Sequence, residues 1–129
     1  MSGKVHVIGG LLIAIASITL AKKYQITIAF DSKDLLIGTF LGSLLPDIDH
    51  KKSFLGSLLH LPIKHRTLTH SLLFLLLVSI IAMQYNLGLS IGLFLGIFSH
   101  ILLDMAGKKS KGVCLFYPSK KRYSFFNLP

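Results

Sequence analysis

The amino-acid sequence predicts an all-α fold: an integral membrane bundle of about four helices with a short basic amphipathic segment on its cytoplasmic side. Two observations lead to this prediction. The chain is 52% hydrophobic and has a mean hydropathy of +0.67, which is too apolar for an ordinary soluble domain. Its apolar residues also fall into four runs, at 7–21, 35–45, 71–83 and 87–103. At 129 residues the chain is expected to form a single domain, 1–129.

The first two runs are short for a membrane span, which takes about 20 helical residues. Lys22 and Lys23 close the run at 7–21, and Pro46 closes the run at 35–45. We expect these helices either to be extended by flanking residues and tilt or to span incompletely. The first run also has the form of a signal peptide, but the residues before Lys22 make a poor cleavage site.

The last two runs predict a pair of antiparallel helices. Only Gln84, Tyr85 and Asn86 separate them, which is the length of a tight helix–helix turn. With their semi-polar flanks, both runs approach the length of a membrane span. A soluble four-helix bundle would need polar positions at a period of 3.6, and the stretch SLLFLLLVSIIAM has none. The pattern therefore favours a membrane bundle.

The positive charges predict how the bundle is oriented. If each run crosses once, the N-terminus, the 46–70 loop and the C-terminal tail share one side, and the 22–34 loop and the 84–86 turn share the other. Of the 14 Lys and Arg residues, 11 fall on the first side and 3 on the second. The positive-inside rule then predicts that both termini are cytoplasmic, in the cytoplasmic membrane of a bacterium or archaeon.

The composition also limits the partners. The formal net charge of +9 would suit nucleic acid, a membrane surface or an anionic substrate. The basic stretch 50–66 predicts an amphipathic segment on the cytoplasmic leaflet, with a solvated loop as the alternative. The tail at 108–129 mixes basic and aromatic residues, and anionic headgroups explain it with fewer assumptions than nucleic acid does. We therefore expect membrane lipids as partners and no nucleic acid.

Ionisable residues gather where the runs meet the predicted cytoplasmic side. The residues that share this position are His6, Asp47, Asp49, His65, Arg66, His70, His100 and Asp104. Asp47 and Asp49, two apart in an expected extended segment, can point the same way. Asp31 and Asp34 fall on the opposite side. Ionisable residues at a membrane edge are costly and usually functional, so the gathering predicts a site.

The residue types predict a metal site. The expected ligands are His6, Asp47, Asp49, His65, His70, His100 and Asp104. Imidazole and carboxylate together suit a divalent ion, with zinc favoured over manganese or iron. Seven ligands are enough for two ions, and paired ions typically serve phosphoester hydrolysis. The single Cys114 excludes a cysteine-type zinc site. His50 is open between ligand and loop residue, and His60 is expected at the interface.

Arg66 and Asp49 are the expected catalytic residues. The fork of donors on Arg66 suits a phosphate oxygen, and one Asp or His would move the proton. A membrane metal transporter or metal sensor is the alternative function. Transport would require polar groups that continue through the bundle, and only scattered Ser and Thr residues lie there. A structural adaptor would leave the convergence of His and Asp unexplained.

Five motifs carry a resemblance to a known family. HVIGG, LLPDIDH, HRTLTHSLL, GIFSHILLD and LFYPSKKRYSF, in this order, resemble the YdjM-like family of bacterial inner-membrane proteins, described as membrane-bound metal-dependent hydrolases. The resemblance covers nearly the whole chain. It implies a membrane hydrolase whose metal is held by the His and Asp residues of these motifs, with Arg66 beside them. The expected substrate is a phosphate ester of a lipid or lipid-linked compound.

Overall fold

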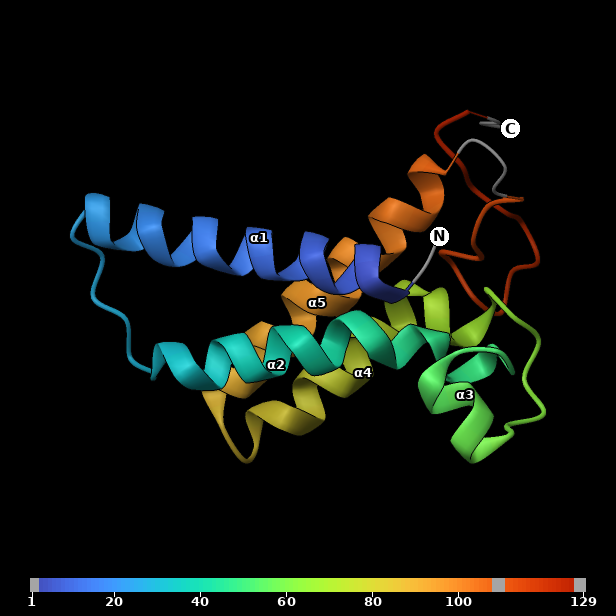
Figure 1. The fold of residues 1–129 in the computed structure, drawn as a ribbon, viewed down its shortest axis with the longest axis horizontal. Coiled ribbons are helices and arrows are strands. Elements are labelled where there is room, and N and C mark those ends of the chain that lie inside the picture. The colour runs from blue at the N-terminus through green and yellow to red at the C-terminus, as the bar shows by residue number, and fades with distance from the viewer. Residues whose placement is uncertain (1–2, 108–110, 127–129) are drawn as a thin grey trace.

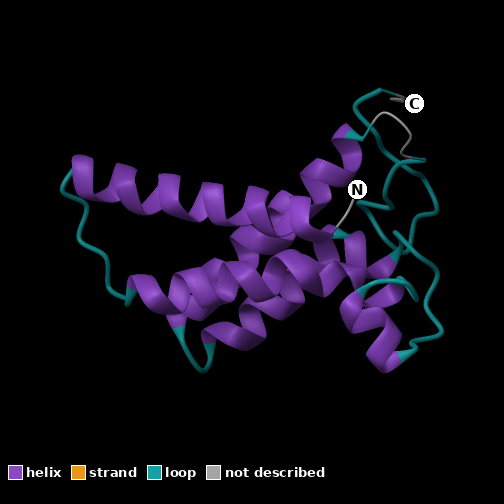
Figure 2. Ribbon diagram, in the orientation of Figure 1, coloured by secondary structure: helices purple, strands orange, loops and turns teal. Residues whose placement is uncertain are grey.

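The computed structural model describes residues 3–107 and 111–126, except for the side chain of Phe54. Within these ranges every regular element is helical (Figures 1 and 2), so the all-α prediction is confirmed. The α-helices are α1 (Gly3–Lys23), α2 (Ser32–Leu44), α3 (Phe54–Leu59), α4 (Leu72–Met83) and α5 (Leu87–Ala106). Two 3₁₀ helices join them: η1 (Leu45–Asp49) follows α2, and η2 (Leu68–His70) precedes α4.

Each of the four apolar runs forms a helix, and polar side chains cap the starts of α2, α4 and α5. The side chain of Asp31 caps α2 by accepting a hydrogen bond from the N–H of Lys33. Ser71 caps α4 and Asn86 caps α5 in the same way. The expected turn at 84–86 is therefore confirmed. Because Ser71 caps α4, this helix has only 12 residues, which corrects the expectation that it approaches the length of a full span.

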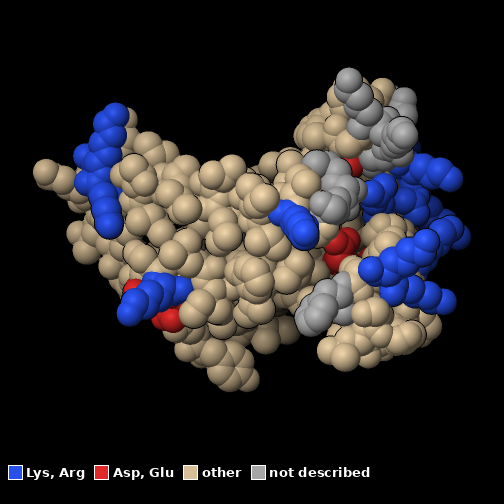
Figure 3. Space-filling view, viewed as in Figure 1, with Lys and Arg blue, Asp and Glu red and all other residues tan. Residues whose placement is uncertain are grey.

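Two helices, α1 and α5, are long and apolar enough to cross a membrane. α4 is apolar, but its 12 residues span about 18 Å, against the roughly 30 Å of a bilayer core. Large apolar side chains point outward along α1 and α4; Leu12 is 62% exposed and Ile81 is 60% exposed. Figure 3 shows Lys and Arg gathered toward the two ends of the molecule, with a largely uncharged surface between them. Such a surface suits a lipid environment. Crossing by all four helices stays a prediction.

Glycines bring α2 and α5 into backbone contact. A methyl group added at Gly92 of α5 would lie 2.3 Å from the carbonyl oxygen of Leu35, and one added at Gly42 of α2 would lie 2.6 Å from that of Leu93. The glycines on this interface recur every four residues, at 38 and 42 on α2 and at 88, 92 and 96 on α5. This spacing is the close-packing pattern of membrane helices.

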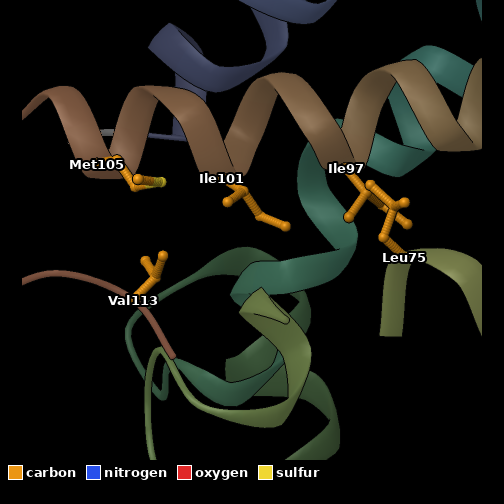
Figure 4. Packing of buried hydrophobic residues seen from close by; sticks show 5 residues of the cluster. All are labelled: Leu75, Ile97, Ile101, Met105 and Val113. Atoms are coloured by element: carbon orange, nitrogen blue, oxygen red, sulfur yellow. The ribbon is translucent and has the colours of Figure 1, made fainter. Parts of the chain in front are cut away.

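An apolar cluster joins α5 to α4 and to the C-terminal segment. Ile97, Ile101 and Met105 point from α5 toward Leu75 of α4 and Val113 (Figure 4). Val113 exchanges two backbone hydrogen bonds with Tyr123, at 3.0 and 2.9 Å, which closes residues 113–123 into a loop. The cluster therefore fixes the C-terminal segment against the end of α5.

The polar ends of the helices meet at one end of the bundle. The start of α1, the end of α2, the start of α4 and the end of α5 lie together there, beside α3 and the C-terminal segment (Figure 1). The 24–31 loop and the 84–86 turn lie at the opposite end. The expected grouping of segments is thus confirmed. The basic stretch 50–66 contains a short helix, α3, on which Leu58 is 71% exposed. Contact of α3 with a leaflet stays a prediction.

Candidate metal centre

Asp104 on α5 lies at the centre of the buried polar cluster and is 2% exposed. Its Oδ2 lies 2.9 Å from Nε2 of His70 and 3.5 Å from Nε2 of His100. Its Oδ1 lies 3.4 Å from Nε2 of His6 and 3.3 Å from Nη2 of Arg66. Three separate parts of the chain therefore supply one carboxylate with imidazole and guanidinium neighbours.

Asp47 lies on the more exposed side of the same cluster. Its Oδ1 lies 3.4 Å from Nε2 of His100, and its side chain is 15% exposed. The ring of His100 stacks on that of His6, with the ring centres 3.7 Å apart. Burial opposes ionisation of Asp47, but the neighbouring imidazoles of His100, His6 and His70 together outweigh burial and lower the pKa of this carboxyl. Asp47 thus favours the ionised form that binds cations.

Asp47 and Asp49 point in different directions, which corrects the expectation of an extended segment. Residues 45–49 form η1, with Pro46 in its first turn, where the fixed φ of proline suits a helix. Each residue of a 3₁₀ helix turns the chain by about 120°, so side chains two residues apart point about 120° away from each other around the axis. Asp47 therefore faces His100, while Asp49 faces His65 and His70.

Asp49 organises the segment that precedes α4. Its Oδ1 lies 2.7 Å from Nδ1 of His65, and its Oδ2 accepts a hydrogen bond from the backbone N–H of Arg66 at 3.0 Å. Oδ2 also accepts the hydroxyl proton of Thr69 and lies 3.5 Å from Nδ1 of His70. Burial opposes ionisation of Asp49, but the imidazoles of His65 and His70 outweigh it and lower its pKa. An ionised Asp49 thus ties this segment to η1.

The backbone fixes the orientation of His100. Its Nδ1 lies 2.6 Å from the carbonyl oxygen of Ser43 on α2, and a carbonyl only accepts hydrogen bonds. A neutral His100 therefore carries its proton on Nδ1 and turns the lone pair of Nε2 toward Asp47 and Asp104. This arrangement, with one ring nitrogen anchored and the other directed at carboxylates, is typical of metal-binding histidines.

Orphaned polar atoms test whether the cluster fits a metal ion. Nε2 of His70, Nε2 of His100 and Oδ2 of Asp104 are buried and have no hydrogen-bond partner within the part of the chain that the structure describes. Oδ2 of Asp104 nevertheless lies only 2.9 Å from Nε2 of His70 and 3.5 Å from Nε2 of His100. Buried polar atoms are rarely left unsatisfied, and a cation held between these lone pairs would satisfy all three. The cluster therefore fits a metal ion.

Three overlapping groups of side chains could hold a metal ion. They are His6, Asp47 and His100; Asp47, His65 and His70; and His70, His100 and Asp104. Each group shares a residue with each of the others, so the six residues form one continuous site. Of the seven expected ligands, Asp49 is outside these groups; it contacts their members His65 and His70. Direct metal ligation by Asp49 stays a prediction.

Contacts of both its backbone and its side chain hold Arg66 at the site. Its backbone has a φ of 61°, in the left-handed region that non-glycine residues seldom adopt. The N–H of Arg66 donates to Asp49, and its carbonyl accepts a hydrogen bond from the N–H of Cys114 at 3.1 Å. Its guanidinium reaches Asp104 and its side chain is 20% exposed. Unusual backbone conformations held by their surroundings often occur at functional sites.

Sequence reasoning missed the role of the C-terminal segment. The N–H of Leu72 donates to the carbonyl of Leu115 at 2.9 Å, and Arg122 reaches the carbonyl of His65 at 3.5 Å. With the bond from Cys114 to Arg66, these contacts hold the segment that carries His65 and Arg66. The mixed basic and aromatic composition suggested only lipid contact. The resemblance to LFYPSKKRYSF was the one signal that this segment belongs to the site.

The remaining polar residues fall as follows. His50 is half-buried, and its ring lies edge-on to that of His65, with the ring centres 4.6 Å apart. His60 is exposed at the end of α3, away from the three groups. Asp34 accepts a hydrogen bond from the side chain of Asn86 at 2.9 Å, at the opposite end of the bundle. Asp31 and Asp34 are thus outside the site, as expected.

Comparison with known proteins gives consistent matches. The model of the family described as YdjM inner membrane protein matches residues 1–129. The protein YvsG of Bacillus subtilis is 37% identical over 131 residues, which cover 95% of this chain and 76% of that protein. The inner membrane protein YdjM of Escherichia coli is 36% identical over 132 residues, which cover 89% of this chain and 66% of that protein, just under two thirds of its length. No solved structure matches this chain.

Proposed function

The chain belongs to the YdjM family of inner membrane proteins, and on this premise we propose that it is a membrane-bound, metal-dependent hydrolase acting on a phosphate ester of a lipid or lipid-linked compound. The observation that carries the proposal is the placement of Arg66 beside the metal-binding groups. Its guanidinium lies 3.3 Å from Asp104, a member of one group, and the Arg66 side chain as a whole is 20% exposed. A site that only stores metal does not need a guanidinium group next to its metal ligands.

Five side chains would hold the metal: His6, Asp47, His70, His100 and Asp104. His65, whose Nδ1 faces Asp49 and whose side chain is 34% exposed, would be left to move a proton. The nitrogen and oxygen donors of the five favour zinc, and the residues shared between the three groups could also serve a second ion. A bound divalent ion supplies Lewis-acid chemistry, which activates water and stabilises negative charge on phosphate oxygens. Asp49 would support His70 from behind, as carboxylates behind metal-binding histidines commonly do, and it also orients His65.

The chain's own residues would then handle charge and protons. Arg66 binds two oxygens of the phosphoryl group through its planar fork and orients the group for attack. The His65 imidazole, which is 34% exposed and oriented by Asp49, takes the proton from the attacking water. The new bond joins the water oxygen to phosphorus, the bond from phosphorus to the lipid oxygen breaks, and the proton passes to that oxygen. The products are phosphate and an alcohol.

The proposal includes an orientation. The end of the bundle that holds the metal centre carries most of the described Lys and Arg residues (Figure 3). The positive-inside rule assigns such an end, with both termini, to the cytoplasm. The same charges would attract anionic headgroups of the cytoplasmic leaflet.

Two variants test the reaction. Arg66→Lys keeps the charge but loses the fork, so metal content should persist while phosphate release from a lipid phosphate falls about 100- to 1,000-fold. Asp104→Ala removes a ligand, so metal content and phosphate release should fall together. His60→Ala, which alters an exposed histidine outside the site, is the matched control. Absence of phosphate release from the metal-loaded wild-type protein across a panel of lipid phosphates would refute the proposal.

The alternative function, a metal transporter or sensor, predicts a different pattern. Metal flux across proteoliposomes would be lost in Asp104→Ala and would depend little on Arg66, because transport needs ligands and not a phosphate-binding fork. Measuring flux and phosphate release on the same two variants separates the two functions. Flux without phosphate release would establish the alternative.

A further inference from the structure

A large apolar groove opens beside the metal centre. Its walls come from the first turns of α1, the second half of α2 and the start of α3, and it encloses about 1100 Å³. The apolar side chains that line it are Val7, Ile8, Phe40, Leu41, Leu44 and Leu55. Sites for drug-sized ligands typically enclose about 300–1,000 Å³, so this groove offers room for a larger molecule.

The groove opens sideways, toward the surface that would face lipid. Ile8 is 59% exposed, and Phe40 and Leu41 are each 45% exposed. These side chains lie on α1 and α2, the helices that run between the two charged ends of the molecule (Figures 1 and 3). A hydrocarbon chain could therefore enter from the bilayer without crossing water.

One end of the groove is polar and reaches the metal centre. Lys4, Lys52 and Asp47 line this end together with Ser53. Asp47 belongs to two of the three metal-binding groups, and at 15% exposure it is more open than Asp49 or Asp104, whose side chains are 0% and 2% exposed. Asp47 is thus where the groove meets the site. Lys4 and Lys52 are both exposed and supply cations beside it.

We propose that this groove binds an anionic glycerophospholipid that enters laterally from the bilayer, with its acyl chains against α1 and α2 and its phosphate between Lys4 and Lys52. The inference rests on the proposed function and names the route and the headgroup residues for its substrate. Charge complementarity decides the occupant. A second copy of the chain or another membrane helix would cover the apolar walls but would not need two lysines at the polar end. The negative charge of Asp47 is offset once it binds a cation.

The chain contains no Trp, so a single introduced Trp can report on the groove. Leu41→Trp and, as a second reporter, Ile8→Trp place the indole on its walls, and Ile81→Trp places it on the exposed face of α4, which contributes no lining residue. The probes are nanodiscs that contain brominated dioleoyl phosphatidic acid or brominated dioleoyl phosphatidylcholine. Bromine quenches a nearby indole, so the readout is binding and requires no turnover.

We expect the groove reporters to be quenched by the brominated phosphatidic acid at lower mole fraction than by the phosphatidylcholine, while Ile81→Trp responds equally to both. Lys4→Gln and Lys52→Gln should each reduce this preference about fivefold, since a lysine near an anionic headgroup contributes about that factor. Lys23→Gln, at the opposite end of the bundle, should leave it unchanged. Equal quenching by the two lipids at Leu41→Trp and Ile8→Trp would overturn the proposal.

Phosphate release from the same nanodiscs and from a soluble aryl phosphate keeps the two proposals separate. A lipid preference without phosphate release supports the groove and counts against the hydrolase. Release from the aryl phosphate without any lipid preference supports the hydrolase and overturns the groove.

Discussion

Replacing Gly92 with alanine tests whether the close contact between α2 and α5 holds the metal centre in place. The added methyl carbon would lie 2.3 Å from the carbonyl oxygen of Leu35, 2.8 Å from the nitrogen of Thr39 and 2.9 Å from Cα of Gly38. All three are backbone atoms, so no side chain can rotate away. A carbon–oxygen contact normally needs about 3.3 Å, and the two helices would have to separate locally by about 1 Å.

This separation has a cost and a consequence. Overpacking typically destabilises by about 1–3 kcal/mol, and alanine recovers up to about 1 kcal/mol through its better helix propensity. We therefore expect a net loss of roughly 1–2 kcal/mol. The bond from His100 to the carbonyl of Ser43 crosses the same interface at 2.6 Å. If the separation extends there, the distance becomes about 3.6 Å, too long for a hydrogen bond, and metal affinity should fall about 10- to 100-fold.

Thermal unfolding in detergent and titration with zinc measure the two effects. Gly3→Ala is the matched control, because its added methyl group would meet only the side chain of Leu44, at an ordinary 3.9 Å. The Gly92 variant should unfold several degrees below wild type and bind zinc more weakly, and the Gly3 variant should do neither. Wild-type stability and wild-type zinc affinity in Gly92→Ala would refute the reasoning.

Two further predictions concern the site and the orientation. Asp49→Asn removes a charge and nearly keeps the shape, so elemental analysis should show less metal with little unfolding, whereas His60→Ala should retain wild-type metal; equal metal in the two variants would remove Asp49 from the site. For orientation, a membrane-impermeant maleimide should label Tyr85→Cys in intact cells and Leu58→Cys only in lysed cells, since these residues are 85% and 71% exposed at opposite ends of the bundle; the reverse pattern would place the metal centre outside the cytoplasm.

The positions of the helices follow from the sequence because their causes are local. Four apolar runs became four helices, and a serine and an asparagine set the starts of α4 and α5. The gathering of histidines and aspartates could also be predicted, since residues at alternate ends of successive helices come together once the helices pack antiparallel. Such a gathering depends only on how far along its helix each residue lies. It does not depend on the direction in which each side chain points.

The different contacts of Asp47 and Asp49 could not be predicted, because the directions of these two side chains depend on the backbone geometry of the five residues in η1. An extended segment would have aligned the two side chains, and the 3₁₀ helix after Pro46 separates them. The anchor of His100 is likewise a backbone carbonyl, that of Ser43, which carries no sequence signature. The contact between α2 and α5, in contrast, does have a sequence signature, because glycines four residues apart in apolar helices indicate close packing.

The choice between hydrolysis and transport depends on what lies beyond the metal centre. A transported ion would need polar groups that continue toward the opposite end of the bundle. Several hydroxyl groups in that direction donate to helix carbonyls: Thr39 to that of Leu35 at 2.8 Å, and Ser43 to that of Thr39 at 2.7 Å. Ser90 donates to the carbonyl of Ser79 at 2.6 Å. These hydroxyl groups are neutral and separated along the helices, so they are weaker ligands for a divalent cation than the carboxylates and imidazoles of the metal centre.

The close packing of α2 against α5 also blocks a path from the metal centre toward the opposite end of the bundle. Gly92 and Gly96 of α5 press against the backbone of α2, so a methyl group added at either would lie within 2.4 Å of a carbonyl oxygen. Helices in such contact leave no channel between them. From Leu87 to Ser99, α5 carries no ionisable side chain, and His100 and Asp104 follow only in its last two turns. A cation bound by Asp104 therefore has ligands on one side and close-packed backbone on the other. This one-sided arrangement favours chemistry on a molecule that comes to the metal over passage of the metal through the protein.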